Sequence, residues 1–400
     1  MPTWLKHFKL NKSLILILLL ASALRLVNLG NPPEYIFDEV YHSFTAREYL
    51  HGHTEAWEWW TTPPPGVAYE WTHPPVAKYG MMGGMWLFGE NSFGWRFGSA
   101  AFGILSILGL YFLVLAVTGN KLTSLISAFL VSIEGLHISQ SRVGMNDVYM
   151  LCFLIWSLYL AVKSRWKLSA LLFGLSLASK WSALYGIVPL SYIYLHGNKI
   201  TLSSLFLALR LLLITIFVYV LTFTPFIMAG HTWAQWWELQ RQMWYYHTHL
   251  VATHGYQSTP LQWLFDVRPV WYYVKYLEDK IANIYALGNP LILWLGLVAF
   301  ILQVKKLRQF AYFLFSFSYL LFTLPWVFSP RIMFFYHYLP SSVFLSIILA
   351  SWLSNLTMRT RSIILLLCLI GLFLISPFLY GFPISKIYWD GVFALFPTWR

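Results

Sequence analysis

The stretch that decides the fold is KSLILILLLASALRLVNLGNPPEYIFDE, residues 12–39. Its first part, Leu14 to Leu24, is almost wholly apolar and follows the basic segment Met1 to Lys12. A secretory signal peptide begins in the same way, but it ends at a cleavage site between small residues. Here Arg25 and Asn28 come instead. We therefore interpret the run as an uncleaved first transmembrane helix, with acidic residues directly beyond it.

The composition extends this interpretation to the whole chain. Of the 400 residues, 58% are hydrophobic and only 10% are charged, whereas soluble domains carry roughly 25% charged residues. The mean hydropathy is +0.60. These values exclude a single soluble core and predict an all-α integral membrane protein, one membrane domain over residues 1–400, with about eleven transmembrane helices. The expected spans are 13–30, 97–118, 122–138, 147–163, 168–180, 182–196, 201–229, 288–304, 309–328, 333–354 and 362–380.

The charges orient these spans. Thirteen of the 27 Lys and Arg residues fall in short loops on one side, and none of the 15 Asp and Glu residues does. This pattern predicts a cytoplasmic N-terminus, and it accounts for much of the net charge of +12 without a nucleic-acid partner. The basic residues are Lys6, Lys9, Lys12, Lys121, Lys163, Arg165, Lys167, Lys199, Lys305, Lys306, Arg308, Arg359 and Arg361. Both cysteines, Cys152 and Cys368, lie inside apolar runs, which favours buried thiols over a disulfide or a metal site.

Two long loops then face outward, residues 30–96 and 230–287. The first holds eight acidic residues, and both are rich in Trp, Tyr, His and Pro. Interfacial helices are expected around Phe44–Leu50 and Trp233–His247. Both loops are therefore predicted to be structured on the membrane surface.

The first loop contains two candidate chemical groups. Asp38 and Glu39 are adjacent carboxylates just beyond the first span, and one of them is suited to act as a general base. The simpler alternative is a solvated loop or a helix cap. His73 and Lys78 lie in HPPVAK, where two prolines stiffen the backbone and can position an imidazole or an ammonium. The alternative for this segment is a simple turn.

Ionisable residues also occur at the ends of spans, where their burial is costly and usually reflects function or pairing. Arg142 and Asp147 can bind substrate or form a structural pair with each other. Lys180 needs an anionic partner, either a phosphate or a protein carboxylate. Arg331 is placed to bind a lipid phosphate, or to anchor the helix end at the interface.

The second loop carries His247, His249 and His254, followed by Ser258 and Trp263. Three histidines raise the possibility of zinc, but the fourth ligand of a zinc site is not evident. An aromatic surface for a sugar or a peptide is favoured, with no metal. The sequence contains no P-loop and no Rossmann glycine pattern. A lipid-phosphate sugar is therefore a better candidate donor than a cytoplasmic nucleotide.

Taken together, these segments resemble the protein O-mannosyltransferase family of the GT-C class of membrane glycosyltransferases. The resemblance covers nearly the whole chain, although each motif alone is modest. Two features depart from the family pattern. The second loop has fewer than 60 residues and cannot hold the MIR domain of eukaryotic members, and Tyr41-His42 stands where His-Phe is common. The matching segments are Asp38-Glu39, His73 to Lys78, Gly94-Trp95-Arg96, Arg142 to Asp147, Ser179-Lys180-Trp181, Ser258 to Trp263, Gly288-Asn289-Pro290 and Arg331 to Pro340.

The resemblance implies a compact prokaryotic enzyme in the cell membrane. It implies transfer of mannose from polyprenyl-phosphate mannose to Ser or Thr hydroxyls of exported polypeptides, with inversion, on the outer face. Asp38 would act as general base, with Glu39 orienting the donor or acceptor. The implied donor-binding residues are Arg96, Arg142, Asp147, Lys180 and Arg331. The implied acceptor-positioning residues are His73, Lys78, His247, Ser258 and Trp263.

Other interpretations remain open from the sequence. The nearest is a GT-C transferase with the same type of donor and a glycolipid or polymer acceptor. A transporter or flippase would carry inverted repeats and polar sites at the membrane midplane, and a metal-dependent hydrolase would use the three histidines of the second loop. Eukaryotic members of the family pair as dimers, so a dimer is a further possibility.

Overall fold

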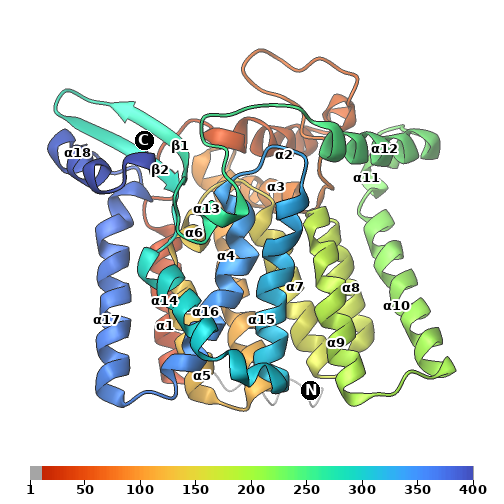
Figure 1. Ribbon diagram of the computed structural model, residues 1–400. Coiled ribbons are helices and arrows are strands. Elements are labelled where there is room, and N and C mark those ends of the chain that lie inside the picture. Colours follow the sequence, from red (N-terminus) through yellow and green to blue (C-terminus); the bar gives the residue numbers. More distant parts are fainter. Residues whose placement is uncertain (1–10, 400) are drawn as a thin grey trace.

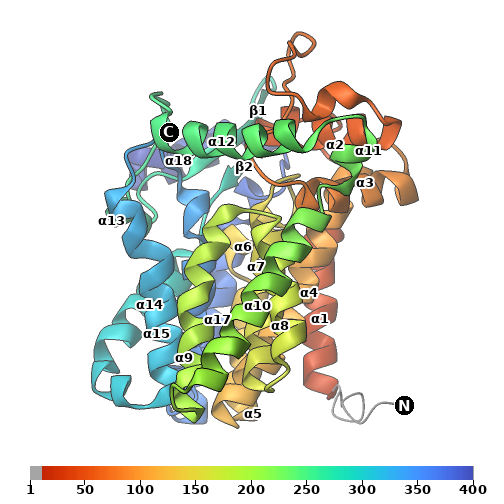
Figure 2. The same cartoon turned by 90° about the vertical axis from the view of Figure 1, so that its right-hand side faces the viewer.

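The computed structural model describes residues 11–399; Lys6 and Lys9 lie outside this range. The fold is mostly helical, at 70%. Figures 1 and 2 show long helices running side by side, with shorter elements gathered at one end of the bundle. The long helices are α1 (Lys12–Leu26), α4 (Ser92–Thr118), α5 (Lys121–Ser132), α7 (Asp147–Val162), α8 (Trp166–Leu177), α9 (Ile187–Gly197), α10 (Leu202–Leu221), α14 (Pro290–Leu302), α15 (Phe310–Thr323), α16 (Leu339–Leu353) and α17 (Met358–Ile375).

Each span expected from hydropathy coincides with one of these helices. Four helical segments within residues 11–399 are long and apolar enough to cross a membrane by themselves. These are Ser92–Thr118, Leu202–Leu221, Phe310–Phe328 and Met358–Phe378. Several others, such as α7 and α8, are apolar but shorter. The count of about eleven spans therefore stays a prediction.

Most of the elements at one end of the bundle come from the two long loops, and α18 (Lys386–Leu395) joins them there (Figure 1). The first loop forms the 3₁₀ turn η2 (Phe37–Val40), α2 (His42–His51) and α3 (Val76–Phe88). The second loop forms α12 (Trp233–His249) and the short α13 (Pro260–Trp263). The expected helices around Phe44–Leu50 and Trp233–His247 are confirmed as α2 and α12. A Thr232–Gln235 capping box starts α12.

The prediction of an all-α chain holds for most residues, with a small sheet as the exception. Strands β1 (Val270–Tyr276) and β2 (Lys280–Ala286) form an antiparallel hairpin, and β3 (Ile384–Ser385) pairs with β2. The β1 sequence VWYYVKY is rich in β-branched and aromatic residues, which favour strands. Aromatic residues are also typical of the membrane interface, and the sequence analysis therefore did not predict the hairpin.

Close packing between α3 and α4 fixes the base of the first loop. A Cβ atom on Gly98 would lie only 2.4 Å from the Gly80 carbonyl oxygen, so the glycines allow the two backbones to touch. A similar contact joins Gly84 to Gly94. This packing holds α3, which begins next to the HPP segment, against the N-terminal half of α4. The end of the first loop is thereby fixed to the helix that follows it.

Candidate active site

Asp38 lies in the turn η2, at the end of the bundle where α2, α3 and α12 gather (Figure 1). The preceding residue, Phe37, has a positive φ of 46° and stacks on Tyr272 of β1 with ring centroids 4.4 Å apart. A positive φ is unusual for a bulky residue and is found where surrounding contacts impose it, often at functional sites. Among residues 11–399, no group hydrogen-bonds the Asp38 carboxylate. Burial raises its pKa to about 6, although His42 and Lys180 act in the opposite direction.

Glu39, the neighbour of Asp38 in sequence, forms a buried ion pair with Arg96, here called the clamp. The guanidinium Nε and Nη2 donate to the two carboxylate oxygens, each at 2.7 Å, and both side chains are almost fully buried. The backbone N–H groups of Ile36 and Gly144 donate to the same carboxylate. Arg96 also donates to backbone carbonyls of the first loop, including that of Pro32. Charge-assisted bidentate pairs of this kind are strong and geometrically specific. The clamp therefore fixes the turn that carries Asp38.

Lys180 and Asp147 form a second buried pair. The Lys180 ammonium lies 2.8 and 2.9 Å from the two oxygens of Asp147. It also lies 5.4 Å from the centre of the Tyr336 ring. Of the two anionic partners that the sequence left open for Lys180, the structure contains the protein carboxylate. Both residues also act electrostatically on Asp38.

Arg142 serves a different purpose in the structure. Its guanidinium donates to the backbone carbonyls of Arg25, Val27 and Asn28, and it stacks 4.2 Å above the Tyr380 ring. These carbonyls belong to the C-terminal end of α1, where helix carbonyls lack partners within the helix. The alternative pairing of Arg142 with Asp147 is not formed.

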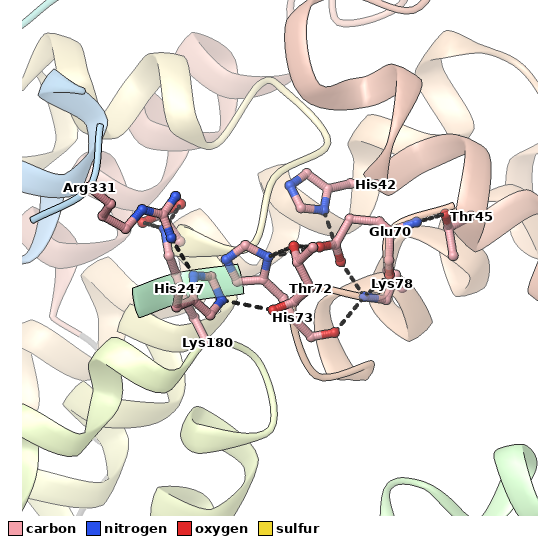
Figure 3. Close-up of polar contacts among 10 residues, drawn as sticks. His42, Thr45, Glu70, Thr72, His73, Lys78, Lys180, His247 and Arg331 are labelled. Carbon is pink, nitrogen blue, oxygen red and sulfur yellow. Dashed lines mark hydrogen bonds and ion pairs between the residues drawn. The ribbon is translucent and has the colours of Figure 1, made fainter. Parts of the chain in front are cut away.

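Glu70 is the central residue that the sequence did not single out (Figure 3). Its carboxylate is 2.8 Å from Nδ1 of His73 and also binds the buried Lys78 ammonium. His42 lies 3.5 Å away. Burial opposes ionisation of Glu70, but Lys78, His73 and His42 together lower its pKa well below the ordinary value. The signal available in the sequence was a carboxylate three residues before His73, in a loop stiffened by prolines.

His247 joins the second loop to the first. Its Nε2 donates to the Thr72 carbonyl at 2.8 Å, and its Nδ1 accepts a hydrogen bond from Arg331. Burial and the Arg331 charge lower the pKa of His247 to about 4. Arg331, His247 and the loop around His73 thus form one continuous set of contacts (Figure 3).

Ser258 and Trp263 lie in the packed base of the second loop. The Trp263 indole N–H donates to the Ser258 hydroxyl at 2.9 Å, and the Ser258 N–H donates to the Met333 carbonyl. Trp263 is fully buried and stacks on His337. These contacts hold the segment that follows Arg331.

The histidines of the second loop have separate surroundings. His249 stacks on Tyr245, and His254 contacts Tyr256 and Phe334. Within the described residues no three His, Cys, Asp or Glu side chains are arranged to hold a metal ion. Metal independence stays a prediction.

Comparison with known proteins now identifies the family. Residues 15–228 match the family described as dolichyl-phosphate-mannose-protein mannosyltransferase. Residues 232–307 match the C-terminal four-transmembrane region of protein O-mannosyltransferases. The chain belongs to the protein O-mannosyltransferase family. It is therefore a glycosyltransferase of the membrane.

Curated relatives agree with this assignment of the mannosyltransferase. The polyprenol-phosphate-mannose–protein mannosyltransferase of Mycolicibacterium smegmatis is 22% identical, with 96% of this chain and 92% of the relative covered. The protein of the same name from Mycobacterium tuberculosis is 23% identical, with 96% and 91% covered.

Solved structures share the fold of the mannosyltransferase. The Saccharomyces cerevisiae Pmt1–Pmt2 complex bound to the sugar donor superposes with a TM-score of 0.80 at 14% identity, covering 99% of this chain and 94% of that chain. ArnT from Cupriavidus metallidurans bound to undecaprenyl phosphate gives 0.60 at 15% identity, covering 89% and 62%. The expected GT-C architecture is thus supported at the level of the fold.

The site of the mannosyltransferase combines a subset of the residues expected from sequence. Asp38, Asp147, Lys180, His73, Lys78, His247 and Arg331 are linked to one another by contacts or by their electrostatic effects. Glu39 and Arg96 pair with each other, and Arg142 binds the carbonyls at the end of α1. Ser258 and Trp263 support the second loop. Glu70 and His42 complete the polar cluster.

Proposed function

We propose that this chain transfers mannose from a polyprenyl-phosphate mannose to a Ser or Thr hydroxyl of an exported polypeptide. The proposal is supported by membership of the family and by the names of the bacterial relatives. The single observation that carries the chemistry is the Asp38 carboxylate, which accepts no hydrogen bond from any group within residues 11–399. Lys180, His42, Glu70 and Asp147 all act on it electrostatically.

In the proposed reaction Asp38 takes the proton from the acceptor hydroxyl. The hydroxyl oxygen attacks the anomeric carbon as the bond from that carbon to the phosphate oxygen breaks. The transition state gains oxocarbenium character, as in glycoside hydrolysis. Attack opposite to the leaving phosphate inverts the anomeric configuration. With a pKa of about 6, most Asp38 carboxylates are ionised at neutral pH. The pKa is also close enough to that pH for Asp38 to be an effective base.

The leaving phosphate is an anion and requires cations more than an acid. Lys180 and Arg331 are the cations that we assign to it, because both belong to the cluster around Asp38 and neither is enclosed by backbone carbonyls as Arg142 is. Fixed cations aimed at developing negative charge act strongly in a site that excludes water. Arg96 is not assigned to the donor, since Glu39 and backbone carbonyls occupy its guanidinium.

We place the reaction on the outer face of the membrane. Lys12, at the start of α1, and Lys121, at the start of α5, lie at the end of the bundle opposite to α2, α3 and α12 (Figures 1 and 2). The positive-inside rule then assigns the end with Asp38 to the non-cytoplasmic side. Because the donor lipid lies in the same membrane, its phosphate can reach that end between the helices.

The test is transfer by the purified protein in lipid nanodiscs. Polyprenyl-phosphate mannose is supplied with a Ser/Thr-rich peptide, and the peptide is analysed by mass spectrometry and by anomer-specific mannosidases. The proposal expects one hexose on a Ser or Thr side chain, with the anomeric configuration opposite to that of the donor. Donor turnover that labels only an added glycolipid or polymer would refute the protein acceptor and support the related GT-C reaction. No turnover with any acceptor would refute the proposed reaction.

A further inference from the structure

Glu70 and Lys78 form a buried ion pair beside Asp38. Lys78 is fully buried, and Glu70 is only 4% exposed. The Lys78 ammonium also donates to the backbone carbonyls of Glu70 and His73, each at 2.9 Å. Three acceptors thus surround the ammonium, so its positive charge is well compensated. A buried carboxylate stays ionised only when it is paired in this way.

The ionised Glu70 carboxylate determines which imidazole nitrogens carry protons. A carboxylate can only accept hydrogen bonds, so a nitrogen that faces it must be an N–H group. Nδ1 of His73 lies 2.8 Å from Oε1, and Nδ1 of His42 lies 3.5 Å from Oε2. In a neutral imidazole the other nitrogen is then an acceptor. The carboxylate therefore sets the tautomer of His73. His42 Nδ1 contacts the same carboxylate at ion-pair distance, without a hydrogen bond.

The free nitrogen of His73 faces the cations of the site. In Figure 3 the His73 ring lies between Glu70 on one side and His247 with Arg331 on the other. Its centroid is 4.9 Å from that of His247 and 5.7 Å from that of His42. Burial lowers the pKa of His73 well below its ordinary value, and Glu70 opposes this only in part. The ring is therefore neutral, with an acceptor nitrogen directed into the polar cluster.

We propose that Glu70 is a positioning residue for glycosyl transfer, which holds His73 as its Nδ1–H tautomer so that its Nε2 atom accepts a hydrogen bond from a substrate hydroxyl in the polar cluster. This inference rests on the proposed function and adds to it. The proton of the acceptor still goes to Asp38, and the His73 imidazole remains neutral throughout. Its contribution is to orient a hydroxyl group, of the sugar or of the acceptor, toward the reacting carbon.

The key variant is Glu70→Gln, tested in the full-length protein. The amide has one oxygen and one NH2 group in place of the two carboxylate oxygens, so it cannot accept from both Lys78 and His73 as Glu70 does. Either Lys78 loses an acceptor, or His73 loses its bond or changes tautomer. We expect kcat to fall about tenfold to hundredfold, the effect of one or two lost hydrogen bonds. The KM for the donor should change little, because Lys180 and Arg331 are untouched.

The pH profile distinguishes a loss of the positioning role of Glu70 from a general disturbance of the fold. Around Asp38, His42 and Lys180 favour the ionised form, whereas Glu70 and Asp147 disfavour it. Glu70→Gln should therefore move the acid limb of kcat to lower pH. In the double variant Glu70→Gln/Lys78→Met, a negative and a positive charge are removed together. The acid limb should then return toward the wild-type position while the loss in kcat persists.

Two comparisons make the experiment decisive. Glu90→Gln removes an exposed carboxylate of the same loop, paired with Arg47 at 2.8 Å, and should leave kcat and the pH profile unchanged. Should Glu70→Gln fail to fold, the double variant still tests the idea, because no buried charge is left unpaired. A folded double variant that binds donor and has wild-type kcat would overturn the role of Glu70. A wild-type protein that transfers no mannose would instead overturn the proposed function, and this inference with it.

Discussion

The ammonium of Lys180 lies 2.8 and 2.9 Å from the two carboxylate oxygens of Asp147, which begins α7. The pair is buried, so each charge is compensated by the other. In the proposed reaction a lipid phosphate would bring a second anion to Lys180. The Asp147 carboxylate would then hold the ammonium in position before the donor binds.

We predict that Lys180→Met weakens donor binding more than acceptor binding. The expected increase in the donor KM is at least about tenfold, equivalent to the loss of one charge-assisted hydrogen bond. Titration of polyprenyl-phosphate mannose at saturating peptide measures this value. Lys180→Met/Asp147→Asn is the matched variant, in which no unpaired carboxylate remains near Asp38. An unchanged donor KM in both variants would make the pair purely structural.

The pH dependence of transfer should report Asp38. Its pKa is raised to about 6 by burial, and only the ionised form accepts the hydroxyl proton. We therefore predict that kcat/KM is constant above this pH and falls about tenfold per unit below it. A profile of kcat/KM from about pH 4.5 to 8.5, with protein stability checked at each pH, tests whether the rate falls as the pH is lowered. A rate that increases as the pH falls below 6 would contradict a carboxylate base.

Loss of either partner of the Glu39–Arg96 clamp should lower the stability of the folded protein. Breaking a buried ion pair by removing one partner costs about 3–5 kcal/mol. Glu39→Gln and Arg96→Met are each expected to lower the thermal unfolding midpoint clearly, measured by tryptophan fluorescence in detergent. The double variant should recover part of the loss, because neither charge is then left alone. Additive losses in the double variant would contradict direct coupling of the two side chains.

Arg142 should affect folding rather than donor binding. Its guanidinium is bound to carbonyls at the end of α1 and to the Tyr380 ring. Arg142→Gln is predicted to lower the unfolding midpoint and to leave the donor KM, per folded molecule, within about twofold. Arg331→Gln serves as the comparison, since it should raise the donor KM. A donor KM raised by both variants to the same extent would assign Arg142 to the phosphate.

Hydropathy and charge predicted much of the fold, because a membrane constrains helix length and loop charge strongly. Every expected span coincides with a helix, and the interfacial helices α2 and α12 occur where their aromatic patterns place them. The hairpin β1–β2 was missed because aromatic residues also mark the membrane interface. Alternating burial in a short strand gives a much weaker signal than an apolar helix.

The site was harder to predict than the fold, because its contacts join distant segments. Asp38 and Lys180 were expected near the chemistry, and their surroundings are consistent with that prediction. The partner of Arg96 is 57 residues away in sequence, and the carbonyl bonds of Arg142 span more than 100 residues. Glu70 was missed because an isolated glutamate in a polar loop is usually solvated. Only the fold shows that it is buried among two histidines and a lysine.

The most direct test of the central claim compares wild-type protein with Asp38→Asn in a single-turnover assay. Both purified proteins are loaded with radiolabelled polyprenyl-phosphate mannose, and donor binding is measured before a Ser/Thr-rich peptide is added. The account predicts equal donor loading and a transfer rate about 10²–10⁴-fold lower in the variant, the usual effect of losing a general base. Transfer at the wild-type rate by a folded, donor-loaded Asp38→Asn protein would contradict it.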